Sequence, residues 1–146
     1  MDGCGAAAVA AARACVGARF RAQGRDPATG LDCVGLAAFA VRAGAARLDV
    51  PNGYRLRGSV ERVAAGLEAL GFARAQELAP GDLMVMRAGP GQGHLGVWTG
   101  TGLVHADARL RRVVETPGAP GWPVTGVWRF GSVEEEEEAG FPRSRE

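Results

Sequence analysis

Segments with helical spacing fill the first half of the chain and short strand-like segments fill the second half. The helical segments are residues 6–16, 34–43 and 59–70, and a glycine follows each of them. The later segments are rich in valine, tryptophan and leucine and are separated by glycine or proline turns; they are residues 83–87, 95–99, 103–107, 112–116 and 124–130. This order predicts an α+β domain, in which N-terminal helices pack on an antiparallel sheet of five to six strands.

The length and composition are those of one domain. The chain has 146 residues, of which 47% are hydrophobic, and this is enough to form a core. Residues 1–133 are therefore predicted to form a single domain. Residues 134–146 begin with five consecutive glutamates and continue as a short polar end, a pattern typical of a disordered tail.

Charge and hydropathy argue against several classes of partner. The net charge is +1 and the arginines are scattered, so nucleic acid is not an expected partner. No apolar stretch approaches the roughly 20 residues that span a bilayer, so we expect no membrane insertion. The apolar stretch at residues 5–14 is preceded by Asp2 and not by a basic region. We therefore predict synthesis in the cytoplasm without a Sec signal.

The three cysteines indicate neither a disulfide framework nor a zinc knuckle. Cys4, Cys15 and Cys33 cannot all pair within the chain, and none belongs to a C-x-x-C pair. Cys33 falls on the first turn of the second predicted helix, where free N–H groups and the helix dipole stabilise a thiolate by about 0.3–1 kcal/mol. Considered by its position alone, a cysteine there is more often a small apolar residue that packs the helix onto the sheet.

The only two histidines lie in neighbouring predicted strands, and the turn between them sets their geometry. A two-residue loop pairs Thr99 with Gly102, which places Gly96 opposite His105 and His94 diagonally from it on the same face. Their Cβ atoms would then be roughly 7 Å apart, within reach of a hydrogen bond between the rings. A three-residue loop would put the rings on opposite faces. The prediction therefore requires a loop of even length.

A thiol beside two imidazoles has the chemistry of acyl transfer. A base removes the thiol proton, the thiolate attacks a carbonyl, and a third group fixes the tautomer of the base. We predict Cys33 as the nucleophile, His94 as the base and His105 as the orienting group, without a metal or cofactor. Each histidine alone more often only hydrogen-bonds in a strand or loop, but the combination favours catalysis. A zinc site of one cysteine and two histidines is less favoured, because no fourth ligand has a useful spacing.

Five short blocks carry a resemblance to a known family. They are residues 16–21, 30–36, 80–83, 93–100 and 104–106. In this order they resemble the Gly-x-x-Tyr, Asp-Cys-Ser-Gly, Pro-Gly-Asp-Leu, His-x-Gly-Ile-Tyr-x-Gly and His-Ala segments of the NlpC-type cell-wall cysteine peptidases, a papain-like family of bacteria and phages. The resemblance covers about residues 6–130. It implies the papain-like fold and the catalytic roles of Cys33, His94 and His105.

The resemblance also implies a substrate and a setting. The family hydrolyses an amide bond in peptidoglycan stem peptides, commonly between D-γ-glutamyl and diaminopimelate, through a thioester acyl-enzyme. The ending Trp128-Arg129-Phe130 is similar to that of the phage-tail and gene-transfer-agent subgroup. This implies particle proteins as partners and delivery to the periplasm or cell wall by a phage-like particle.

Two positions depart from the family pattern. Phe20 stands where most members carry a tyrosine whose hydroxyl lies beside the nucleophile, and Val34 replaces a serine. A lost oxyanion donor lowers turnover by about 10²–10³, whereas Val34 is expected to change packing more than chemistry. The residues predicted to bind substrate are Phe20, Asp32, Tyr54 and Arg55. The last two lie in the loop 47–58, for which an ordinary solvated loop is the alternative.

Two other functions are compatible with the same residues. One is a catalytically weak or inactive phage-tail module that binds peptides with this fold, which the phenylalanine at position 20 would explain. The other is a related amidase or acyltransferase with the same triad. The three tryptophans, Trp98, Trp122 and Trp128, are predicted to lie in the sheet core and not to serve as sugar platforms, because tryptophans at strand positions usually pack.

Overall fold

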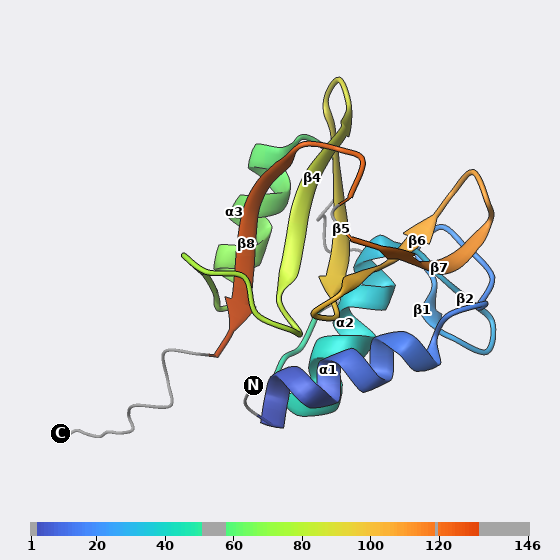
Figure 1. The fold of residues 1–146 in the computed structure, drawn as a ribbon, viewed down its shortest axis with the longest axis horizontal. Coiled ribbons are helices and arrows are strands. Elements are labelled where there is room, and N and C mark those ends of the chain that lie inside the picture. Colours follow the sequence, from blue (N-terminus) through green and yellow to red (C-terminus); the bar gives the residue numbers. More distant parts are fainter. Residues whose placement is uncertain (1–2, 51–57, 119, 132–146) are drawn as a thin grey trace, which may run out of the picture.

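A computed structural model describes residues 3–50, 58–118 and 120–131, and it contains three helices and two sheets. The helices are α1 (Gly3–Ala14), α2 (Cys33–Gly44) and α3 (Val60–Ala69). The strands are β1 (Arg25–Asp26), β2 (Gly30–Leu31), β3 (Phe72–Arg74), β4 (Leu83–Gly89), β5 (Gln92–Trp98), β6 (Gly102–Asp107), β7 (Arg112–Pro117) and β8 (Val124–Phe130). Figure 1 shows the helices gathered around the sheet, with α1 and α2 side by side. The predicted α+β class is confirmed.

The larger sheet is antiparallel throughout and has the order β3-β8-β4-β5-β6-β7. The last strand therefore returns to lie between β3 and β4. The sequence predicted five of these strands and missed β3, because three residues are too few to show a period of two. The small hairpin of β1 and β2 was also missed, since it lies in a segment that its glycines and proline mark as a loop.

Local signals set the starts of two helices. Asp32 caps α2 by accepting a hydrogen bond from the N–H of Gly35 at 2.8 Å, and Ser59 caps α3 by accepting from the N–H of Arg62 at 3.2 Å. Gly71 follows α3 with a φ of 101°, which a residue with a Cβ rarely adopts. Gly44 was expected just beyond α2 but is its last residue, and Ala45 follows as the cap.

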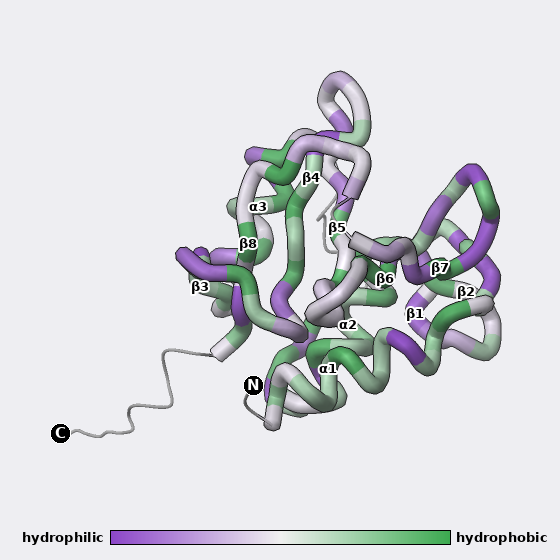
Figure 2. The backbone as a smooth tube through the Cα atoms, viewed as in Figure 1, coloured by the Kyte–Doolittle hydropathy of each residue, from purple (hydrophilic) through white to green (hydrophobic). Residues whose placement is uncertain are grey.

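One apolar core joins all three helices to one face of the larger sheet. Its members include Ala12 of α1, Leu36 of α2 and Leu67 of α3, together with Val85 and Val97 of the central strands. Figure 2 shows β4 and α2 green over most of their length, which agrees with their hydrophobic sequences. A smaller cluster of Met84, Met86 and Leu103 lies apart from this core, and Trp98 and Trp122 pack against it. Burial of these side chains is the main source of stability.

An ion pair joins the sequence block 80–83 to the Trp-Arg-Phe ending at residues 128–130. Arg129 of β8 donates from Nε to Asp82 at 2.7 Å and from a second guanidinium nitrogen to the other carboxylate oxygen at 2.8 Å. Asp82 is 2% exposed, and Trp128 beside it is also 2% exposed within the core. The core position predicted for Trp128 is confirmed, and the residues of the Trp-Arg-Phe ending have structural partners.

The acidic segment 134–146 lies outside the described residues, and so does the boundary of the predicted domain at residue 133. Among the described helices, none has both the length and the apolar character needed to cross a bilayer.

Candidate active site

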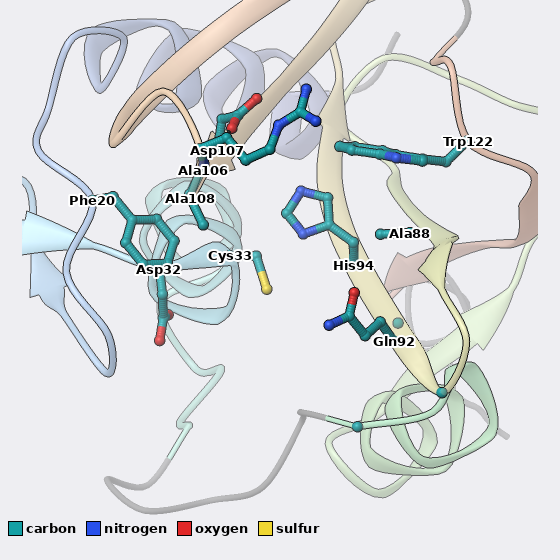
Figure 3. Close-up of a pocket in the computed structure, with 14 residues that line it drawn as sticks. Phe20, Asp32, Cys33, Ala88, Gln92, His94, Ala106, Asp107, Ala108 and Trp122 are labelled. Atoms are coloured by element: carbon teal, nitrogen blue, oxygen red, sulfur yellow. Dashed lines mark hydrogen bonds between the residues drawn. The ribbon is translucent and has the colours of Figure 1, made fainter.

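A cavity of about 420 Å³ lies where the start of α2 approaches β5 and the end of β6. Cys33 and His94 both line it, and Asp107 and Trp122 form part of its wall (Figure 3). Phe20 and Asp32, which the sequence predicted to contact substrate, line the same cavity. Residues far apart in the chain therefore converge in one pocket.

The turn between β5 and β6 has the length that the histidine prediction required. The N–H of Thr99 donates to the carbonyl of Gly102 at 2.9 Å, and Val97 pairs with Val104 in the ladder. The two-residue loop is therefore confirmed. As a result, Nε2 of His94 lies 3.3 Å from Nδ1 of His105, with the ring planes at 89°. His105 is 3% exposed and is therefore more deeply buried than His94, which is partly exposed.

The sulfur of Cys33 takes a hydrogen bond at the point where the ladder between β5 and β6 ends. The ladder between β5 and β6 consists of the pairs at Val97 and Trp98. If the ladder continued with the same alternation, the N–H of Leu95 would bond to the carbonyl of Ala106. The N–H of Leu95 instead hydrogen-bonds to the Cys33 sulfur. Where the β5–β6 ladder ends, the Leu95 N–H is thus a donor for the Cys33 sulfur, in the cavity that Cys33 and His94 share.

The thiol of Cys33 is protonated at neutral pH. Burial raises the pKa of the Cys33 thiol, and hydrogen bonds from the N–H groups of Leu95, Val34 and Cys33 itself act in the opposite direction. The side chain is partly exposed, in contrast to that of Cys15, which is 1% exposed. Because the burial effect is the larger one, a base beside the sulfur is needed to generate the thiolate at neutral pH.

Both imidazoles are neutral at the same pH. The pKa of His94 is lowered to about 4. Burial is the largest cause, the neighbouring His105 acts in the same direction, and the carboxylate of Asp107 opposes both. Burial also lowers the pKa of His105, again opposed by Asp107. A neutral imidazole has a free lone pair that can accept a proton. His94 is therefore in the protonation state that a general base requires.

Asp32 fixes the position of Cys33. One carboxylate oxygen accepts from Gly35 within α2, and the other accepts from the N–H of Gln23 at 2.6 Å. The absence of a side chain at Gly35 lets the backbone at Gly24 lie close to the start of α2, because a Cβ at position 35 would overlap the carbonyl oxygen of Gly24. These contacts give Asp32 a structural role at the helix start, and its contact with substrate stays a prediction.

Tyr54 and Arg55 lie outside the described residues, so their predicted contact with substrate also stays a prediction. Phe20 is partly buried, and its backbone forms an isolated bridge with Leu31 just before the α2 cap. Within the described residues, no group of three or more histidine, cysteine, aspartate or glutamate side chains is arranged to hold a metal ion.

Trp122 corrects one prediction. It was expected in the sheet core, but it lies in the turn before β8 and contacts both imidazoles. Its neighbours Gly121 and Pro123 interrupt the strand pattern, so the alternation of side chains gives no direction for it. Asp107 is a second pocket residue that the sequence analysis missed. Its place two residues after His105 on a strand, and hence on the same face, was an available signal.

The low pKa of His94 predicts acid-sensitive stability. In the folded protein the His94 imidazole takes up a proton only near pH 4, whereas in the unfolded chain it does so near pH 6.5. The free energy of unfolding is therefore expected to fall by about 3 kcal/mol as the pH drops from 7 through this window, and below it His94 adds no further loss. Urea unfolding at a series of pH values measures the change. His94→Gln is the matched control and should show a smaller pH dependence; identical curves would contradict the prediction.

The fold is shared with solved NlpC/P60 structures. The chain is similar to NlpC1 from Trichomonas vaginalis, with a TM-score of 0.65 and 17% identity over 86% of this chain and 44% of that one. It is similar to the NlpC/p60 domain of the peptidoglycan hydrolase SagA, with a TM-score of 0.57 and 25% identity over 83% of this chain and 97% of that domain. For the peptidoglycan hydrolase RipB from Mycobacterium tuberculosis, the TM-score is 0.57 and the identity 23% over 86% of this chain and 64% of that one.

These similarities confirm the predicted fold and support the resemblance to the NlpC-type family. The chain spans less than two thirds of the length of NlpC1 and of RipB, but almost all of the SagA domain. No protein-family model and no curated protein matches the sequence. The phage-tail subgroup stays a prediction from the residues at 128–130.

Proposed function

We propose that this chain is a cysteine peptidase that hydrolyses an amide bond in peptidoglycan stem peptides. The observation that carries the proposal is the single pocket shared by Cys33 and His94, with His105 hydrogen-bonded to His94 (Figure 3). The similarity to a domain of the peptidoglycan hydrolase SagA supports the class of substrate. A thiol and an imidazole in one pocket, with a second imidazole hydrogen-bonded to the first, fit acyl transfer better than simple packing.

The hydrogen bond between the imidazoles assigns a nitrogen to each role. Nε2 of His94 is engaged with Nδ1 of His105, which leaves Nδ1 of His94 as the nitrogen available to the thiol. If Nε2 of His94 carries the hydrogen and donates it to His105, then Nδ1 has the free lone pair. His105 thus selects the tautomer of His94 that can act as a base.

The reaction follows from these positions. Nδ1 of His94 accepts the thiol proton as the Cys33 sulfur attacks the amide carbon, and the negative charge moves to the carbonyl oxygen. N–H groups at the start of α2 are placed to stabilise that charge. His94 then returns the proton to the leaving amine, which leaves a thioester on Cys33. A water molecule, deprotonated by His94, attacks the thioester and releases the acid and the free thiol.

We assign the bond between D-γ-glutamyl and diaminopimelate as the one cleaved, on the basis of the sequence resemblance. The charges in the pocket support a substrate of this kind. Asp107 and Arg109 both line the cavity, and a stem peptide around diaminopimelate carries both amine and carboxylate groups. Delivery by a phage-like particle is a further part of the proposal that rests on the sequence alone.

The test is digestion of a synthetic stem peptide that contains this bond, followed by mass spectrometry. We expect two products whose summed mass exceeds that of the substrate by one water, with a new γ-carboxyl on one and a new amine on the other. Release of fragments from intact sacculi would extend the result to the polymer. Absence of cleavage with both substrates would contradict the proposed function.

Thiol labelling separates the peptidase from a peptide-binding module with the same fold. In a peptidase, His94 accelerates alkylation of Cys33, so His94→Gln is expected to slow that labelling by about 10²-fold near neutral pH. Cys4 is an internal control, because it is exposed and its sulfur contacts the carbonyl of Gly44 at 3.0 Å, on the helix end opposite Cys33. Peptide mapping by mass spectrometry follows both thiols. Equal rates for Cys33 in the two proteins would favour the binding module.

A further inference from the structure

We propose that Trp122 is a positioning residue that holds the His94–His105 pair in its reactive arrangement and keeps water away from it. The catalytic consequence rests on the proposed function, whereas the placement of the indole does not. Trp122 stands in the turn before β8, while the two histidines belong to β5 and β6. The residue that would order the pair therefore comes from a different part of the chain.

Three rings meet nearly at right angles. The centroid of Trp122 lies 5.1 Å from that of His94 at 78°, and 5.5 Å from that of His105 at 83°. The two imidazoles are themselves 5.4 Å apart at 89°. Edge-to-face contacts in this distance range are attractive and depend on orientation. The indole thus contacts both members of the pair at once, and a rotation of either imidazole disturbs both of its aromatic contacts.

The indole of Trp122 also packs against the sheet. It packs against the cluster of Met84, Met86 and Leu103, which belong to β4 and β6. His94 lies opposite Met86 in the ladder between β4 and β5, so the indole and the imidazole share one patch of the sheet. This anchoring lets Trp122 act as a fixed wall and not as a mobile cover.

The pair needs such support, because its own hydrogen bond is weak. The distance of 3.3 Å between Nε2 of His94 and Nδ1 of His105 is beyond the usual N–H···N optimum. A single long hydrogen bond leaves the side-chain torsions of both rings poorly fixed. Displacement of a reacting group by about 1 Å can cost 10²-fold in rate. Contacts from a third ring restrict those torsions.

The charged surroundings explain why exclusion of water matters. Among the residues that the structure describes, the titratable groups that face the imidazoles are each other, Cys33 of α2, Asp107 of β6 and Arg109 of the following turn. Asp107 favours the protonated form of both rings, so burial must outweigh it to keep them neutral. Trp122 is an apolar neighbour that covers both rings, and its removal would admit water and let Asp107 dominate.

The experiment is an NMR titration of the imidazoles in the wild-type protein, Trp122→Ala and Trp122→Phe. The chain has only two histidines, so His94→Gln suffices to assign their signals. We expect Trp122→Ala to raise the pKa of His94 by about one unit or more. Trp122→Phe keeps an aromatic ring in place and should stay within a few tenths of a unit of the wild type. Trp98→Ala is the matched truncation, because Trp98 packs on the same cluster and the described contacts include none between it and an imidazole.

Kinetics provide the second readout. In Trp122→Ala, kcat for the stem peptide should fall by about 10²-fold with little change in KM, and the acidic limb of the pH profile should move to higher pH. Trp122→Phe should restore most of the rate. An unchanged or lower His94 pKa in Trp122→Ala, or an equal rise in Trp98→Ala, would overturn the inference. If the wild type cleaves no stem peptide, the proposed function fails, and the titration still decides the role of Trp122.

Discussion

Cys33→Ala is expected to stop the release of stem-peptide fragments, with a loss of about 10⁴-fold or more in kcat. Without the sulfur no thioester forms, and the pocket retains only its binding and electrostatic contributions. The substitution should leave the fold intact, because alanine is favourable in a helix and the side chain is small and partly exposed. Chromatographic measurement of peptide release from sacculi, with unfolding curves for both proteins, checks the prediction.

Cys4→Ala is the matched control for this substitution. Cys4 is an exposed cysteine in the first turn of α1, outside the pocket residues, so its replacement removes a thiol without touching the site. The control variant should digest sacculi at the wild-type rate. Equal digestion by the wild type and by Cys33→Ala would refute the role of Cys33 as nucleophile and with it the proposed mechanism.

Phe20→Tyr is expected to increase kcat by about 10²–10³. Phe20 lines the cavity with Cys33, and in the family that the sequence resembles this position usually carries a tyrosine beside the nucleophile (Figure 3). The added hydroxyl would supply one more hydrogen-bond donor to the oxyanion. Because this interaction strengthens in the transition state, KM should change little.

Steady-state kinetics with the synthetic stem peptide measures this effect. Phe20→Leu is the control, since it changes the packing of the ring without adding a donor, and it should not raise kcat. An unchanged kcat in Phe20→Tyr would show that the oxyanion is already fully stabilised by other donors, such as the N–H groups at the start of α2. That result would contradict the expected benefit of the hydroxyl.

Several features of the site were predictable from the sequence because short-range geometry controls them. The hairpin between β5 and β6 has a two-residue turn, and its parity alone places His94 and His105 on one face. Asp32 caps a helix through a bond that spans three residues, which puts Cys33 on the first turn. These relations involve few residues, so turn and capping chemistry largely determine them.

The other features of the site depend on packing between segments that are distant in the sequence. The sequence could not show that the β5–β6 ladder ends at Val97, that the Leu95 N–H hydrogen-bonds to the Cys33 sulfur, or that Trp122 contacts both imidazoles. Nor could it give the low pKa of His94, which depends on burial. The sequence by itself determined the three helices and five of the six strands of the larger sheet, the α+β class and the register of the histidine hairpin. The tertiary structure alone decided the pocket and its protonation states, because desolvation and contacts between distant segments exist only after the chain has packed.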